Sequence, residues 1–136
     1  MDKPPLTIGA LDAERLDTLL AHPQFADTEV ARALGEELDR AEIVEPVAIP
    51  ADVVTMNSRV RFRDLLTGEE HIRTLVYPAG LSDSREQISV MAPLGAALLG
   101  MHLGNSIAWP LPNGENTRIE VLELLYQPEA AGEYHR

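Results

Sequence analysis

The chain has 136 residues, a formal net charge of −11 and no cysteine. This length suffices for one ordinary domain with its own core, or for a small domain with a helical appendage, so folding requires neither disulfides nor a structural metal. The lack of cysteine excludes thiolate metal sites and cysteine nucleophiles, and the negative charge argues against direct binding of DNA.

Acidic residues are densest in the first part of the chain. Residues 1–50 carry eleven acids against four basic residues, whereas residues 51–136 carry eleven against seven. A protein partner with a basic surface would therefore be attracted to the amino-terminal part. The first residues lack a basic segment followed by an apolar run, and no stretch approaches the ~18 consecutive apolar residues of a membrane span. We therefore expect a cytoplasmic protein that does not bind membranes.

The first third of the chain predicts two amphipathic helices. Leucines recur at helical spacing from Ala10 to about Ala21, and Pro23 ends this helix because proline disfavours helical geometry in the residue before it. After a loop over residues 21–28, Asp27 or Thr28 can cap a second helix, with Glu29 in its first turn. The second apolar stripe consists of Val30, Leu34, Leu38 and Ala41. Two stripes joined by a short loop predict an antiparallel helical hairpin, a short coiled coil.

The pattern changes from helical to alternating after two prolines in the segment Glu45–Pro50. We therefore expect a helical hairpin over residues 1–46 and a second domain over residues 47–136. A strand is predicted from Val54 to Phe62. Further strands are predicted at 71–77, 87–90, 106–111 and 118–125, with a short helix from Pro93 and a tight turn at Asn113-Gly114. The predicted class is α+β, with a mainly antiparallel β domain.

Two groups of charged residues admit both a local and a functional interpretation. The acidic run consists of Glu36, Glu37, Asp39 and Glu42. It is typical of the solvated side of a helix, although it could also face a basic groove in a partner. Arg59, Arg61 and Arg63 alternate on one predicted strand face, where Glu69 or Glu70 could pair with them. An exposed strand face is the favoured interpretation, with an acidic partner patch as the alternative.

The sequence contains no pattern typical of an active site. The four histidines His22, His71, His102 and His135 do not have the spacing of metal ligands. No phosphate-binding loop, serine-nucleophile motif or cofactor motif occurs either. We therefore expect a protein that is not an enzyme and that needs no cofactor.

Several motifs resemble known families. The stretch from Ile88 to Ile107, followed by Pro112-Asn-Gly and Ile119–Glu123, is similar to the carboxy-terminal domain of the Gre transcript-cleavage factors. This resemblance implies an FKBP-like fold. A closer resemblance, to the Rnk family, regulators of nucleoside diphosphate kinase by name, covers essentially the whole chain. It rests on Leu11–Arg15, Asp52–Val60, Arg73–Pro78, Ser89–Gly100 and Tyr126–Gly132.

The resemblance implies a protein that binds RNA polymerase at the rim of its secondary channel and competes with Gre factors there. The positions that match the Gre contact loop are Met91, Ala92 and Pro93. Met91 replaces the polar residue of the Gre factors, so apolar contact would take the place of a hydrogen bond. We expect a monomer, and any effect on nucleoside diphosphate kinase would be indirect.

Transcript cleavage is the alternative function that the resemblance raises. Gre factors use an Asp-x-x-Glu pair at the tip of a long coiled coil, whereas this chain offers Asp27 and Glu29 as Asp-x-Glu. A second helix of roughly 14 residues spans only ~21 Å. Capping and compensation of the helix dipole explain both acids. We therefore expect no cleavage activity. A prolyl isomerase is a third hypothesis, and the small number of aromatic residues argues against it.

Overall fold

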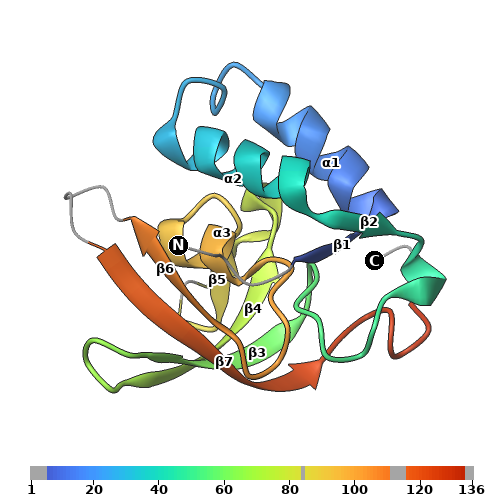
Figure 1. Ribbon diagram of the computed structural model, residues 1–136. Helices are drawn as coiled ribbons and strands as arrows, with labels where there is room; N and C mark the ends of the chain where they lie inside the picture. The colour runs from blue at the N-terminus through green and yellow to red at the C-terminus, as the bar shows by residue number, and fades with distance from the viewer. Residues whose placement is uncertain (1–5, 84, 111–115, 134–136) are drawn as a thin grey trace.

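The computed structural model describes residues 6–83, 85–110 and 116–133 (Figure 1). The predicted Asn113-Gly114 turn and His135 lie outside these ranges. In chain order the elements are β1 (Thr7–Gly9), α1 (Ala10–Ala21), α2 (Glu29–Arg40), β2 (Glu42–Val44), η1 (Pro46–Ala48), β3 (Arg59–Asp64), β4 (Glu70–Val76), η2 (Pro78–Gly80), β5 (Gln87–Ser89), α3 (Pro93–Leu98), β6 (Ser106–Pro110) and β7 (Asn116–Tyr126). The predicted α+β class is confirmed.

The two predicted helices are present as α1 and α2, each of 12 residues. His22 is extended, with φ −68° and ψ 133°, so α1 ends directly before Pro23 as predicted. Thr28 is the N-cap of α2, and its side chain accepts a hydrogen bond from the Ala31 amide. Figure 1 shows the two helices running in opposite directions, with the 22–28 loop at one end.

A pair of very short strands at the base of the helices was not predicted. β1 pairs in parallel with β2, and Ile8 lies opposite Ile43. The pair places the start of α1 next to the end of α2, and the Thr7 amide also donates to the carbonyl of Gly100 at 3.2 Å. Strands of three residues are too short for the alternating pattern that identifies strands in a sequence.

The second part of the chain forms a five-stranded sheet in the order β5-β4-β3-β7-β6. Every neighbouring pair is antiparallel except β4 and β5, which are parallel. Figure 1 shows this sheet curling around α3. The mainly antiparallel sheet with one short helix is therefore confirmed.

The strand predicted from Val54 begins only at Arg59, so that prediction was wrong for the first residues. Asn57 has a left-handed backbone conformation, with φ 69°, which a strand cannot contain. The turn is held by Ser58, whose amide donates to the Thr55 carbonyl and whose hydroxyl accepts from the Thr55 amide, both at 3.0 Å. Apolar residues nevertheless alternate from Val54 to Phe62, because those before the turn and those after it are both buried in the core.

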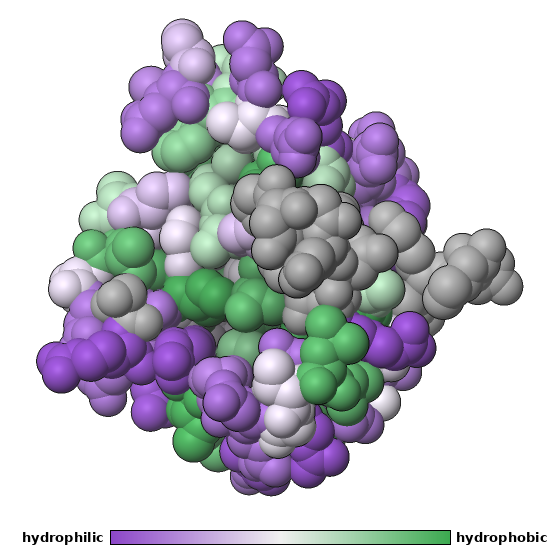
Figure 2. All heavy atoms as spheres, turned by 90° about the vertical axis from the view of Figure 1, so that its left-hand side faces the viewer, coloured by the Kyte–Doolittle hydropathy of each residue, from purple (hydrophilic) through white to green (hydrophobic). Residues whose placement is uncertain are grey.

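Both predicted segments contribute to the same hydrophobic core. Leu16 of α1 and Leu34 of α2 are fully buried in one cluster with Phe62 of β3, Leu98 of α3 and Val121 of β7. Figure 2 shows hydrophilic residues at the top and bottom of one face and apolar residues between them, at the height where the helices meet the sheet. The helices therefore lie against the sheet and share its core. The division at residues 46 and 47 stays a prediction. Within the described ranges, no helix is long and apolar enough to span a membrane.

Candidate functional site

The loop predicted to bind a partner is a tight corner between β5 and α3. The hydroxyl of Ser89 accepts a hydrogen bond from the Met91 amide at 3.1 Å, and the Ser89 carbonyl accepts one from the Ala92 amide at 3.0 Å. Ala92 is the N-cap of α3 and Pro93 is its first residue, as the sequence predicts. Met91, Ala92 and Pro93 are half-buried, so each presents part of its surface to solvent in a fixed geometry.

The corner depends on a glycine in the first turn of α3. A Cβ atom added to Gly95 would lie 2.0 Å from the Ser89 carbonyl oxygen and 2.8 Å from its carbon. Only glycine permits this approach of helix and strand backbone. Gly95 therefore fixes how closely α3 packs on β5, and with it the position of the loop between them.

Asp27, in the loop between α1 and α2, and Glu29, the first residue of α2, are both exposed. Of the two capping candidates, the structure selects Thr28, whose hydroxyl oxygen lies 3.1 Å from the Ala31 amide and donates to the Phe25 carbonyl at 2.7 Å. Glu29 occupies the first turn of α2, where a negative charge stabilises the positive end of the helix dipole. The predicted compensation of the helix dipole is therefore confirmed for Glu29. The capping role belongs to Thr28 and not to Asp27.

The two groups of predicted site residues belong to different elements. Met91, Ala92 and Pro93 come from the β5–α3 corner, whereas Asp27 and Glu29 come from the start of α2 and the loop before it. Among the described residues, no hydrogen bond or ion pair joins the two groups. The structure thus does not bring the two groups of predicted site residues together.

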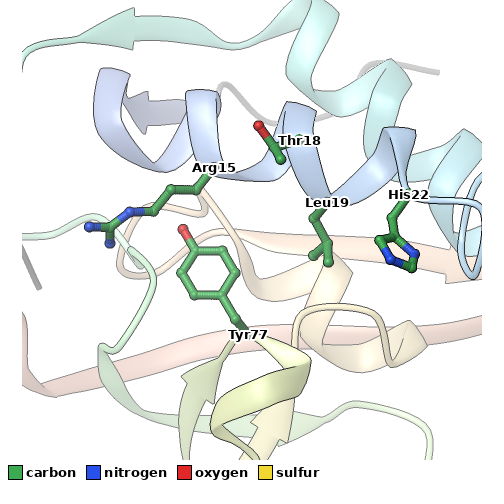
Figure 3. Close-up of a pocket in the computed structure, with 5 residues that line it drawn as sticks. All are labelled: Arg15, Thr18, Leu19, His22 and Tyr77. Atoms are coloured by element: carbon green, nitrogen blue, oxygen red, sulfur yellow. The ribbon is translucent and has the colours of Figure 1, made fainter.

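Two adjoining hollows lie between α1 and the segment that follows β4. One has a volume of about 330 Å³ and is lined by Arg15, Thr18, Leu19, His22 and Tyr77 (Figure 3). The other, also about 330 Å³, is lined by Leu19, His22, Gln24, Phe25, Pro78 and Ala79. Figure 3 shows the Tyr77 ring rising from the wall opposite α1, with its hydroxyl pointing toward Arg15. We call the combined hollow the α1–η2 groove.

A buried carboxylate lies behind this groove. Asp12 is only 3% exposed; one of its oxygens accepts from the Met56 amide at 3.2 Å and the other from the Tyr77 hydroxyl at 3.3 Å. The pKa of Asp12 is raised to about 6, because burial, with a smaller contribution from the negative charge of Glu129, outweighs the two hydrogen bonds and Arg15, which lower it. Burial and the neighbouring Asp12 charge also raise the pKa of Tyr77 well above its ordinary value.

The charged runs that the sequence singled out are largely satisfied within the fold. Glu37 is 2% exposed and pairs with Arg40 at 2.7 Å, so the expectation that the whole acidic run is solvated was wrong at this position. Arg61 contacts Glu70 at 2.6 Å and Glu123 at 3.2 Å. Arg63 also contacts Glu70, at 2.9 Å, so the predicted pairing across the hairpin is confirmed for Glu70.

Sequence reasoning missed the residues around the groove. Asp12 was only one residue of the predicted first helix, and Tyr77 only the last residue of a predicted strand. Arg15 and His22 had no assigned role. The one available signal was the placement of a carboxylate on the apolar side of the helix, four residues before the buried Leu16. Among the described residues, no group of three histidine, aspartate or glutamate side chains could hold a metal ion.

Comparison with known families matches nearly the whole chain. Residues 49–126 match the model described as "Transcription elongation factor, GreA/GreB, C-term", and residues 4–44 match the model described as "Rnk N-terminus". The β5–α3 corner lies inside the first match, and α1, α2 and both strands of the small parallel pair lie inside the second.

Comparisons with individual relatives support the same family assignment. The chain is 59% identical over 134 residues to the regulator of nucleoside diphosphate kinase of Escherichia coli K12, covering 98% of both proteins. It is 36% identical over 94 residues to the transcription elongation factor GreA of Helicobacter hepaticus, covering 69% of this chain and 57% of that protein. A solved structure of a GreA/GreB elongation factor from Nitrosomonas europaea superimposes with a TM-score of 0.71 at 47% identity, covering 91% of this chain and all of that one.

Proposed function

Because the chain belongs to the GreA/GreB family of transcription factors, with the amino-terminal segment of the Rnk type, we propose that it regulates transcription by binding RNA polymerase. The observation that carries the proposal is the match over residues 49–126, which includes the β5–α3 corner. In this proposal Met91, Ala92 and Pro93 contact the rim of the secondary channel, with the Met91 side chain supplying apolar contact.

The geometry of the corner supports this assignment. The backbone amides of Met91 and Ala92 are held by the hydrogen bonds that they donate to Ser89, and the proline ring restricts the start of α3. A loop ordered in this way loses little conformational entropy when it binds, so its affinity is not reduced by the need to order itself. Its half-buried residues can contact a partner without prior rearrangement.

The hairpin has a different part in the proposal. The domain after residue 46 is FKBP-like and docks on the polymerase, while the α1–α2 hairpin, a short coiled coil, points toward the active centre without reaching it. Each helix has 12 residues and therefore spans only roughly 18 Å. The core packing of Leu16 and Leu34 also holds the helices against the sheet, which limits how far they can extend.

Occupancy is therefore the proposed mode of action. The monomeric protein, in the cytoplasm, competes with Gre factors for the same channel and performs no transcript cleavage itself. A change in nucleoside diphosphate kinase levels, suggested by the name of the E. coli relative, would follow indirectly from altered transcription.

Transcript cleavage by Asp27 and Glu29 is the competing function. One observation favours it: both carboxylates are exposed at the hairpin tip, where they are free to reach a metal ion held by a partner. Two carboxylates alone make a weak magnesium site, and the first-turn position of Glu29 already accounts for that residue. We therefore favour binding without cleavage.

Retention on immobilised RNA polymerase tests the proposal. We expect the wild-type chain to be retained and Pro93→Asp to be lost, because a charge at the corner would be desolvated in the contact. Pro50→Asp is the matched control, since Pro50 is exposed and lies outside the corner. Failure of the wild type to be retained would contradict the proposal, and equal retention of Pro93→Asp would contradict the assignment of the corner.

A further inference from the structure

The α1–η2 groove is a second candidate contact surface, distinct from the corner. Its two hollows share Leu19 and His22, and together they run along one side of α1 to the 22–28 loop. The Leu19 side chain and the Tyr77 ring form apolar walls that face each other across it (Figure 3). Each hollow is large enough for one or two side chains of a bound segment.

The charge of the groove differs from that of the protein as a whole. The chain carries a net charge of −11, yet no described residue lining the groove is acidic, and both Arg15 and His22 line it. The neighbouring furrow between α1 and α2 has a negative net charge, because Asp17, Glu36 and Asp39 line it together with a single basic residue, Arg32. The two sides of α1 therefore differ in charge. The groove, which is lined by basic and apolar residues, is suited to a ligand that is both acidic and apolar.

The groove and the β5–α3 corner are connected to neighbouring parallel strands, β4 and β5. β4 and β5 are parallel, with Val76 opposite Ser89, and the Val90 amide donates to the Val76 carbonyl at 2.9 Å. Tyr77 and Met91 therefore leave the sheet from the same ends of neighbouring strands, one toward the groove and the other into the corner. A partner bound at the corner has the groove within reach.

We propose that the α1–η2 groove binds an acidic, apolar segment of the protein that docks on the corner. An apolar side chain of that segment packs between Leu19 and Tyr77, and a carboxylate beside it pairs with Arg15 at one end or accepts from His22 at the other. This inference rests on the proposed function, since the partner in question is RNA polymerase. The groove would add affinity and fix the orientation of the α1–α2 hairpin on the polymerase.

Filling the groove tests the inference. Thr18 lies at its edge and is exposed, so Thr18→Trp would occupy the space without disturbing the core. Thr67→Trp is the matched control, because Thr67 is also an exposed threonine and lies in the turn between β3 and β4, away from the groove. In a titration against RNA polymerase, we expect Thr18→Trp to weaken binding at least tenfold and Thr67→Trp to bind like the wild type. Thermal unfolding of both variants checks that they are folded.

A charge change provides a second, independent variant. His22→Glu places a carboxylate in the groove at an exposed position, and we expect it to weaken binding about as much as Thr18→Trp. If both variants bind like the wild type while Pro93→Asp does not, the groove inference is wrong and the proposed function stands. If the wild type does not bind polymerase, both are wrong.

Discussion

The hydroxyl of Tyr77 donates a hydrogen bond to the buried carboxylate of Asp12 across 3.3 Å, which joins α1 to the end of β4. The other oxygen of Asp12 accepts from the Met56 amide, so one side chain of α1 satisfies two polar groups in the part of the chain that follows α2. These polar contacts accompany the packing of Leu16 and Leu34 into the core. The position of the helices on the sheet therefore depends on a titratable group.

The first prediction concerns the pH dependence of stability. The pKa of Asp12 rises from 3.8 to about 6 on folding, so the folded protein binds the proton more tightly than the unfolded chain does. The stabilisation that this proton gives is present at low pH and is lost as the pH rises through 6. The free energy of unfolding of the wild type, minus that of Asp12→Asn, should therefore fall by about 2 kcal/mol between pH 4 and pH 7.

Urea unfolding at a series of pH values measures this difference. Asp17→Asn is the matched control, because Asp17 is on the same helix but exposed, and its difference from the wild type should change far less over the same range. If the difference in free energy of unfolding between the wild type and Asp12→Asn did not change with pH, Asp12 would ionise in the folded protein as it does in the unfolded chain, and the prediction would be wrong.

The second prediction concerns the glycine that sets the β5–α3 corner. Gly95→Ala should destabilise the protein by about 2 kcal/mol or more, because the new methyl group overlaps the Ser89 carbonyl. Gly35→Ala in α2 is the control, since nothing lies within 4 Å of its added Cβ; it should stabilise the protein by up to about 1 kcal/mol. Midpoints of urea unfolding measure both, and equal midpoints for the two variants would contradict the close packing of α3 on β5.

The third prediction separates the roles of neighbouring residues at the hairpin tip. Thr28→Ala removes the acceptor for the Ala31 amide and should destabilise the protein by about 1 kcal/mol. Thr28→Ser keeps a hydroxyl and should have little effect. Asp27→Ala should also have little effect. If thermal unfolding showed a larger loss of stability for Asp27→Ala than for Thr28→Ala, Thr28 would not be the cap.

The extent to which the sequence predicted this fold depends on the length of each element. Both 12-residue helices and the short helix from Pro93 carried strong local signals, namely apolar periodicity, a cap and a proline. The strands β1 and β2 carried no such signal, because three residues are too few to show an alternating pattern. Their pairing also joins segments that are far apart in the chain. The turn at Asn57 was hidden for another reason: the apolar residues around it are buried, so their spacing mimicked a strand.

For the candidate site too, the sequence predicted local features but not the contacts between residues far apart in the chain. The corner from Met91 to Pro93 was located by family resemblance, and its local geometry follows from Ser89 and Pro93, which are only four residues apart in the chain. The groove combines Arg15 and Leu19 with Tyr77, about 60 residues later, so only the tertiary fold brings them together. Periodicity indicated that Asp12 was in a helix but could not reveal that the sheet domain covers it.

A transcript-cleavage assay on backtracked elongation complexes tests the central claim, binding without cleavage, most directly. The complexes would be incubated with this chain alone, with a Gre factor alone, and with both together. We predict that the chain alone leaves the transcripts at full length and that it slows the cleavage stimulated by the Gre factor. Shortening of the transcripts by the chain alone, abolished when Asp27→Ala and Glu29→Ala are combined, would contradict the account.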